Sequence, residues 1–167
     1  MHLGIIGTSP ISRDFITACQ LSKSFTPSAI YSRQEASANA FLKPGEILSI
    51  YTDVASFLES DCDIIYIASP NSLHYKQAKQ AILAKKHVIV EKPITTAPED
   101  LEDLMALAKQ EGVFLFEAAR HIHEASILTI KKFLENKSVI GGSMTFMQYS
   151  SKMATTTSWR TTKHLFS

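Results

Sequence analysis

Gly7 ends a short apolar run over residues 3–6 and stands directly before a helical pattern. A tight strand-to-helix turn at such a place points backbone N–H groups and the positive end of a helix dipole at a phosphate. The usual dinucleotide pattern is G-x-G-x-x-G/A, and this chain has Gly7, Ser9 and Ser12 at its three positions. The glycine allows the turn, Ser9 limits the approach of a phosphate, and Ser12 is small enough for helix–strand packing. We interpret residues 7–12 as a candidate pyrophosphate-binding turn, and a tight turn without a ligand is the alternative.

A second candidate position follows the next apolar run, residues 28–32. In dinucleotide-binding folds an acidic residue there binds the ribose 2′-hydroxyl of NAD. This chain instead has Ser32 and Arg33. A hydroxyl next to a guanidinium suits a 2′-phosphate, so the sequence favours NADP over NAD. The alternative is that Arg33 is an ordinary surface charge.

Two further groups of polar residues follow strongly apolar runs. Ser69-Pro70-Asn71 comes after residues 64–68, with His74 three residues later, and Glu91-Lys92-Pro93 comes after residues 88–90. Open α/β sheets bind ligands at the carboxyl ends of their strands. A lysine at that edge can stabilise charge that develops on a carbonyl oxygen. Lys92 as a plain surface charge, and His74 as a helix cap rather than a ligand contact, are the alternatives.

The elements that must position these residues alternate between apolar runs and helical patterns. We predict strands over residues 3–6, 28–32, 47–51, 64–68, 88–90 and 113–116. Helices are predicted over residues 11–19, 35–42, 53–58, 75–84 and 98–110. Strands that are apolar on both faces and separated by helices indicate a parallel sheet covered on each side. The predicted fold is therefore α/β, with a doubly wound, mostly parallel sheet of the Rossmann type.

The sequence changes character after residue 119. Residues 123–135 have a helical stripe, and residues 143–149 alternate as a strand whose sheet partners are missing. Residues 150–167 are polar and rich in threonine, and we assign them to no element. Because a lone edge strand with apolar residues on both faces is poorly stable in water, we predict a homodimer through the strand at residues 143–149.

Composition excludes several classes of function. The chain has 17 basic and 16 acidic residues, a balance that gives no support for a nucleic-acid partner. No apolar run approaches the roughly 20 residues that cross a bilayer. Cys19 and Cys62 lack metal-ligand spacing, and His121 and His123 do not share a helical face, so no metal site is predicted. Free, buried thiols are typical of a reducing compartment, and we expect a cytoplasmic protein.

Taken together, the motifs resemble those of the Gfo/Idh/MocA oxidoreductases. Glu91-Lys92-Pro93 matches the family's E-K-P motif, residues 69–74 are similar to its T-P-N-x-x-H segment, and residues 117–123 are similar to its E-A-x-R/M-x-x-H segment. The resemblance implies that Lys92 is catalytic. It also implies a cofactor site made of Gly7, Thr8, Ser9, Pro10, Ile11, Ser32, Arg33, Ser69, Pro70, Asn71, His74, Glu91, Lys92 and Ala119.

The resemblance also implies a domain organisation and an activity. Residues 1–119 are expected to form an NAD(P)-binding Rossmann domain, and residues 120–167 the truncated start of a second, α+β domain for substrate binding and dimerisation, with its first helix and strand. The expected activity is NAD(P)-dependent hydride transfer to or from a sugar, polyol or related hydroxy compound. The alternative is a truncated dinucleotide-binding remnant or a regulatory module without turnover.

Overall fold

The structure is a computed structural model that describes residues 1–141, 143 and 145. Its contacts divide the chain into two compact units, residues 1–124 and 125–167. The first unit extends five residues past the expected boundary at residue 119, because the short 3-10 helix Arg120–His123 belongs to it.

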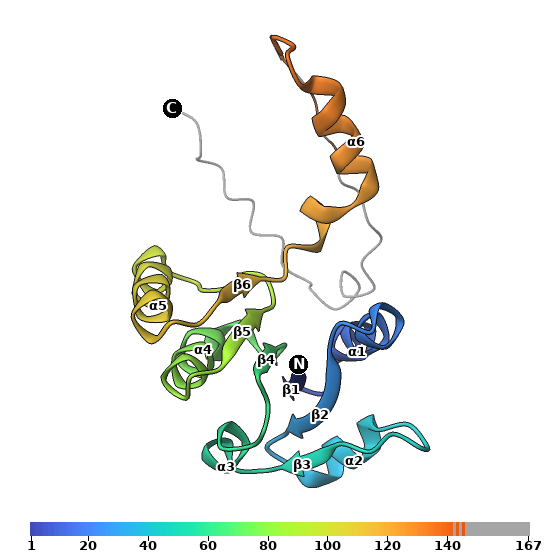
Figure 1. Ribbon diagram of the computed structural model, residues 1–167, viewed down its shortest axis with the longest axis vertical. Coiled ribbons are helices and arrows are strands. Elements are labelled where there is room, and N and C mark those ends of the chain that lie inside the picture. Colours follow the sequence, from blue (N-terminus) through green and yellow to red (C-terminus); the bar gives the residue numbers. More distant parts are fainter. Residues whose placement is uncertain (142, 144, 146–167) are drawn as a thin grey trace, which may run out of the picture. The chain divides into compact units, whose positions relative to one another are not determined.

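The first unit is built on a parallel sheet of six strands, which confirms the predicted α/β fold (Figure 1). The strands are β1 (His2–Ile6), β2 (Thr26–Tyr31), β3 (Ser49–Tyr51), β4 (Ile64–Ile67), β5 (His87–Val90) and β6 (Leu115–Glu117). Their order is β3-β2-β1-β4-β5-β6, and every pairing is parallel. This is the doubly wound order, in which the chain leaves the central strand in opposite directions in its two halves.

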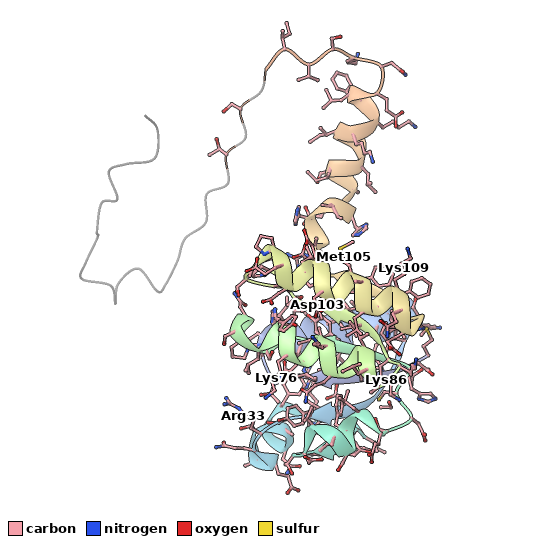
Figure 2. All side chains as sticks on the ribbon, turned by 90° about the vertical axis from the view of Figure 1, so that its left-hand side faces the viewer. Arg33, Lys76, Lys86, Asp103, Met105 and Lys109 are labelled. Atoms are coloured by element: carbon pink, nitrogen blue, oxygen red, sulfur yellow. The ribbon has the colours of Figure 1, made fainter. Side chains whose placement is uncertain are left out.

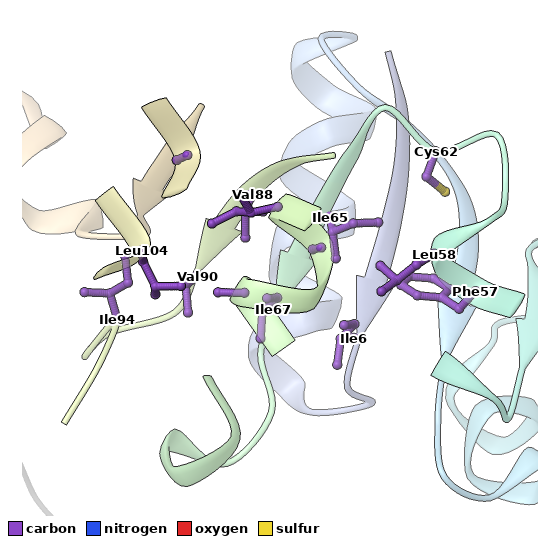
Figure 3. Close-up of a cluster of buried hydrophobic side chains, with 14 of the residues drawn as sticks. Ile6, Phe57, Leu58, Cys62, Ile65, Ile67, Val88, Val90, Ile94 and Leu104 are labelled. Atoms are coloured by element: carbon purple, nitrogen blue, oxygen red, sulfur yellow. The ribbon is translucent and has the colours of Figure 1, made fainter. Parts of the chain in front are cut away.

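Helices cover both faces of this sheet, with α1 (Pro10–Ser22) and α2 (Glu35–Phe41) on one side. On the other side lie α3 (Val54–Leu58), α4 (His74–Leu83) and α5 (Pro98–Glu111). Each face has its own apolar cluster, and β4 is buried along its whole length because it contributes to both. The cluster beneath α4 and α5 contains Ile65, Ile67, Val88 and Leu104 (Figure 3).

Three strands begin two residues away from the predicted start, and the other three differ from prediction by one residue at one end. β2 begins at Thr26, earlier than predicted, because Thr26 pairs with His2 at the start of β1. The strand predicted from residue 47 begins at Ser49, since Ile47 is 92 % exposed and makes no sheet pairing. The last strand, β6, is shifted toward the carboxyl end, so that Glu117 pairs with Val90. These shifts move no strand out of its predicted order in the chain.

The second unit contains α6 (Ala125–Leu134), which confirms the helix predicted near residues 123–135. The strand predicted over residues 143–149 lies outside the described residues, apart from 143 and 145. Among the residues that the structure describes, no helix is long and apolar enough to cross a membrane.

Leu104 and Met105 are neighbours on α5 and provide a test of which helix face packs on the sheet. Leu104 is fully buried, whereas Met105 is 60 % exposed (Figures 2 and 3). We expect Leu104→Ala to lower the free energy of unfolding by about 2–5 kcal/mol, because it leaves a cavity in the core. The matched change Met105→Ala should alter it by less than about 0.5 kcal/mol. Urea unfolding followed by circular dichroism measures both, and equal losses would contradict this packing.

Candidate functional site

A cleft of about 800 Å³ lies at the carboxyl ends of β1, β2 and β4. It brings together seven of the residues predicted for the site: Gly7, Thr8, Ser9, Ser32, Arg33, Ser69 and Pro70. A smaller hollow of about 480 Å³ adjoins it and shares Thr8, Ser9 and Ser37 with it, and Pro10 lines this hollow. The three loops that sequence reasoning treated separately therefore surround one cavity.

Gly7, directly after β1, packs closely against the backbone at the end of β4. Its φ is +109°, a backbone conformation that side chains with a Cβ atom rarely adopt. A Cβ at this position would lie 2.7 Å from the carbonyl oxygen of Ala68. The backbone of residue 7 can therefore pass the end of β4 only as glycine, and this contact sets the floor of the cleft.

The turn leads directly into α1. Ser9 is the N-cap, and its Oγ accepts a hydrogen bond from the Ser12 N–H at 3.5 Å. Pro10 occupies the first helical position, where the missing N–H would have had no partner within the helix. Ser12 is fully buried, in agreement with its predicted packing role, and Ile11 is 38 % exposed. The N–H groups of Thr8, Ser9 and Ile11 are suited to binding an anion.

The loop after β2 contributes a hydroxyl and a guanidinium. The Ser32 N–H donates to the carbonyl oxygen of Tyr51 at 3.0 Å, and Ser32 Oγ donates to the carbonyl oxygen of Gln34 at 3.0 Å. Arg33 is exposed and forms no ion pair with any residue that the structure describes. The charged residues that line the cleft are Arg33 and Lys76, and the described lining contains no carboxylate.

His74 is completely buried and joins two loops. Its Nδ1 lies 2.8 Å from the carbonyl oxygen of Pro93, and its Nε2 lies 2.9 Å from the carbonyl oxygen of Ser69. Ser69 Oγ in turn donates to Gln77 Oε1 at 2.6 Å. Because both ring nitrogens face backbone oxygens, His74 holds the loop after β4 against the loop after β5 and does not line the cleft.

Tyr66 fixes Glu91 in a similar way. The buried Tyr66 hydroxyl donates to Glu91 Oε1 at 2.6 Å, and its ring stacks on Phe15 with the centroids 3.8 Å apart. Burial raises the pKa of Tyr66 well above its usual value, and the Glu91 carboxylate raises it further, so the hydroxyl keeps its proton. Lys92, next to this anchored carboxylate, is exposed and precedes Pro93 through a cis peptide bond.

Six predicted site residues lie outside the lining of the cleft: Ile11, Asn71, His74, Glu91, Lys92 and Ala119. Asn71 is exposed at the start of the 3-10 helix Asn71–Leu73. Ala119 is partly buried just after β6, and its N–H donates to the carbonyl oxygen of Glu117. Glu91, Lys92 and Ala119 follow β5 and β6, the two strands beyond β4 in the sheet. They therefore stand at the same edge as the cleft, further along it.

Sequence reasoning missed several residues of the cleft: Tyr31, Gln34, Ser37, Val54, Leu73, Lys76, Gln77 and Gln80. Most of them come from α2, α3 and α4, where ordinary polar residues on a helix resemble a solvated face. One signal was available for Lys76. A lysine in the first turn of a helix is opposed by the helix dipole, which favours acidic residues there.

Gly7 provides a direct test of the close approach at the floor of the cleft. We expect Gly7→Ala to lower the free energy of unfolding by at least about 2 kcal/mol, because it adds backbone strain and a contact with Ala68. Gly112 is the matched control, since it also has a positive φ, +71°, but has no atom within 4 Å of an added Cβ. Gly112→Ala should cost about 1 kcal/mol. Urea unfolding of both variants measures the difference, and equal losses would show that Ala68 is not in the way.

Comparisons with known proteins agree with this geometry. Residues 1–119 match the model of an oxidoreductase family with an NAD-binding Rossmann fold, GFO_IDH_MocA. Among curated relatives, scyllo-inositol 2-dehydrogenase (NADP(+)) IolU of Bacillus subtilis is 32 % identical over 154 residues, covering 91 % of this chain and 47 % of the relative. A second relative is a dTDP-3,4-didehydro-2,6-dideoxy-alpha-D-glucose 3-reductase of Actinomadura kijaniata. It is 31 % identical, and the match covers 84 % of this chain and 42 % of the relative.

Solved structures show the same relationship. KijD10, a 3-ketoreductase from Actinomadura kijaniata in complex with NADP and TDP-benzene, superposes with a TM-score of 0.75 at 28 % identity. The match covers 81 % of this chain and 42 % of KijD10. The chain thus spans less than half the length of these relatives. Because the family model matches residues 1–119, well over half of the chain, the chain belongs to the Gfo/Idh/MocA family of oxidoreductases.

Proposed function

We propose that residues 1–119 bind NADP in preference to NAD, and that Lys92 serves hydride transfer between the nicotinamide and a sugar, polyol or related hydroxy compound. One observation carries this proposal. The loop after β2 presents Ser32 and Arg33 where an NAD site has an acidic residue, and the described lining of the cleft has two cations and no carboxylate. Such a cleft attracts a phosphorylated ligand and gives a 2′-phosphate an ionic partner.

The loops around the cleft suit the successive parts of a dinucleotide. The N–H groups of Thr8, Ser9 and Ile11, in the turn that leads into α1, are the donors that would bind the pyrophosphate. Ser32 and Arg33 are placed for the adenosine ribose and its 2′-phosphate. The remaining predicted contacts, Ser69, Pro70, Asn71, His74, Glu91 and Ala119, belong to the nicotinamide half, where His74 and Glu91 act by holding their loops.

Lys92 is the residue that we assign to the reaction itself. NADP, when bound, supplies or accepts the hydride. The Lys92 ammonium, which follows Glu91 in the chain, would donate a hydrogen bond to the reacting oxygen and stabilise the negative charge that develops on it. The activities in the names of two relatives, an inositol dehydrogenase and a sugar-nucleotide 3-reductase, support a carbohydrate-like substrate.

A homodimer through residues 143–149 and a cytoplasmic location stay predictions. The predicted location is supported by two free, buried cysteines.

Cofactor preference is tested by fluorescence titration of the chain with NADPH and, separately, with NADH. We expect saturable binding that is tighter for NADPH. Arg33→Gln should weaken NADPH binding by about 10- to 100-fold, the effect of one lost ionic hydrogen bond, and leave NADH binding within about twofold. Wild-type binding of neither cofactor, or equal binding of both, would contradict the proposal.

The role of Lys92 is tested by turnover of NADP with a panel of polyols and sugars that begins with scyllo-inositol. We expect Lys92→Ala to lower kcat by about 100- to 1,000-fold, the usual effect of removing one donor to a developing oxyanion. The dissociation constant of NADPH should change by less than about twofold. Lys109→Ala, on α5 and outside the cleft, is the control that should retain full activity. Wild-type turnover that survives in Lys92→Ala, or binding of NADPH by the wild type without turnover of any compound, would contradict this role.

A further inference from the structure

Lys76 stands in an electrostatically unfavourable place on its own helix. It lies in the first turn of α4, where the helix dipole favours acidic residues, and that turn contains none. Its side chain is exposed and forms no salt bridge with any described residue. The charge of Lys76 therefore gains nothing from the helix dipole or from an ion pair with a described residue, and it is available to a ligand.

The position of Lys76 is explained by the cleft. Lys76 lines it together with Arg33, and these are the charged residues of the described lining (Figure 2). Arg33 follows β2 and Lys76 follows β4, and these two strands flank β1 on its two sides. The two cations therefore approach the cleft from opposite halves of the fold. Because β1 lies between β2 and β4 in the sheet, the turn after β1 that is proposed to bind the pyrophosphate lies between the loops after β2 and β4.

We propose that Lys76 is a second cation for the 2′-phosphate and that, with Arg33, it determines the preference for NADP. This inference rests on the proposed function. A phosphate monoester carries about −1.5 to −2 charges at pH 7, so one guanidinium does not neutralise it. Arg33 supplies a planar, two-pronged donor, and Lys76 supplies a compact charge on a flexible stem that reaches from the other wall.

The alternative position for the Lys76 ammonium is the pyrophosphate, which NAD and NADP share. The N–H groups at the start of α1 already supply hydrogen-bond donors for the pyrophosphate. These donors lie on the loop after β1, whereas Lys76 follows β4. The two possibilities differ in one measurable respect. A contact with the 2′-phosphate affects NADPH binding alone, whereas a contact with the pyrophosphate affects NADPH and NADH equally.

The test compares the dissociation constants of NADPH and NADH for the wild type and for Lys76→Gln, Lys76→Arg and Lys109→Gln. We expect Lys76→Gln to weaken NADPH binding about tenfold and to leave NADH binding within about twofold. Lys76→Arg should restore most of the NADPH affinity. Lys109→Gln, an equal change of charge on α5 outside the cleft, should change neither affinity. The wild-type preference for NADPH should also fall with added salt, and more steeply than in Lys76→Gln.

Each contrary result has a distinct meaning. Unchanged NADPH binding in Lys76→Gln, or an equal loss for both cofactors, overturns the assignment of Lys76 and leaves the proposed function intact. Wild-type binding of neither cofactor contradicts the proposed function and this inference together. Unfolding of each variant by urea shows whether a loss of affinity reflects loss of the fold.

Discussion

The parallel pairing of β1 with both β2 and β4 is the constraint on which the rest of the site depends. It places the carboxyl ends of three strands at one edge, so the loops that follow them meet there although they are far apart in the chain. The pairing also brings residue 7 so close to Ala68 that only glycine fits. The apolar clusters on the two faces hold this arrangement in place, because β4 contributes side chains to both.

Polar side chains near this edge hold the loops that follow β4 and β5. Tyr66 holds Glu91 through a hydrogen bond of 2.6 Å, and His74 spans the loops after β4 and β5 through its two ring nitrogens. In the part of the chain that the structure describes, no buried side-chain nitrogen or oxygen lacks a neighbour at hydrogen-bonding distance, which limits the penalty of unsatisfied polar atoms in the core. The result is that the exposed Lys92 projects from a loop that is already in position.

The presence of six strands, their order along the chain and their parallel pairing could be predicted from the sequence, because apolar runs separated by helical patterns admit few other arrangements. Strand ends were less predictable, since Thr26 belongs to β2 only through its pairing with His2. In the site, Gly7 and Arg33 were found from their places in a known pattern. Tyr66 was missed because its hydroxyl is hidden within an apolar strand, and Lys76 because a cation on a helix resembles a solvated residue until the tertiary fold turns it toward the cleft.

An NMR titration of the 15N-labelled chain with NADPH tests the central claim most directly, because it reports the place of binding residue by residue. The account predicts that the largest amide shifts occur at Gly7, Ser9, Arg33 and Ser69, around one cleft at the ends of β1, β2 and β4. Amides on the far side of α5 should be unaffected. Shifts that cluster away from these loops, or none at saturating NADPH, would contradict a dinucleotide site at this edge of the sheet.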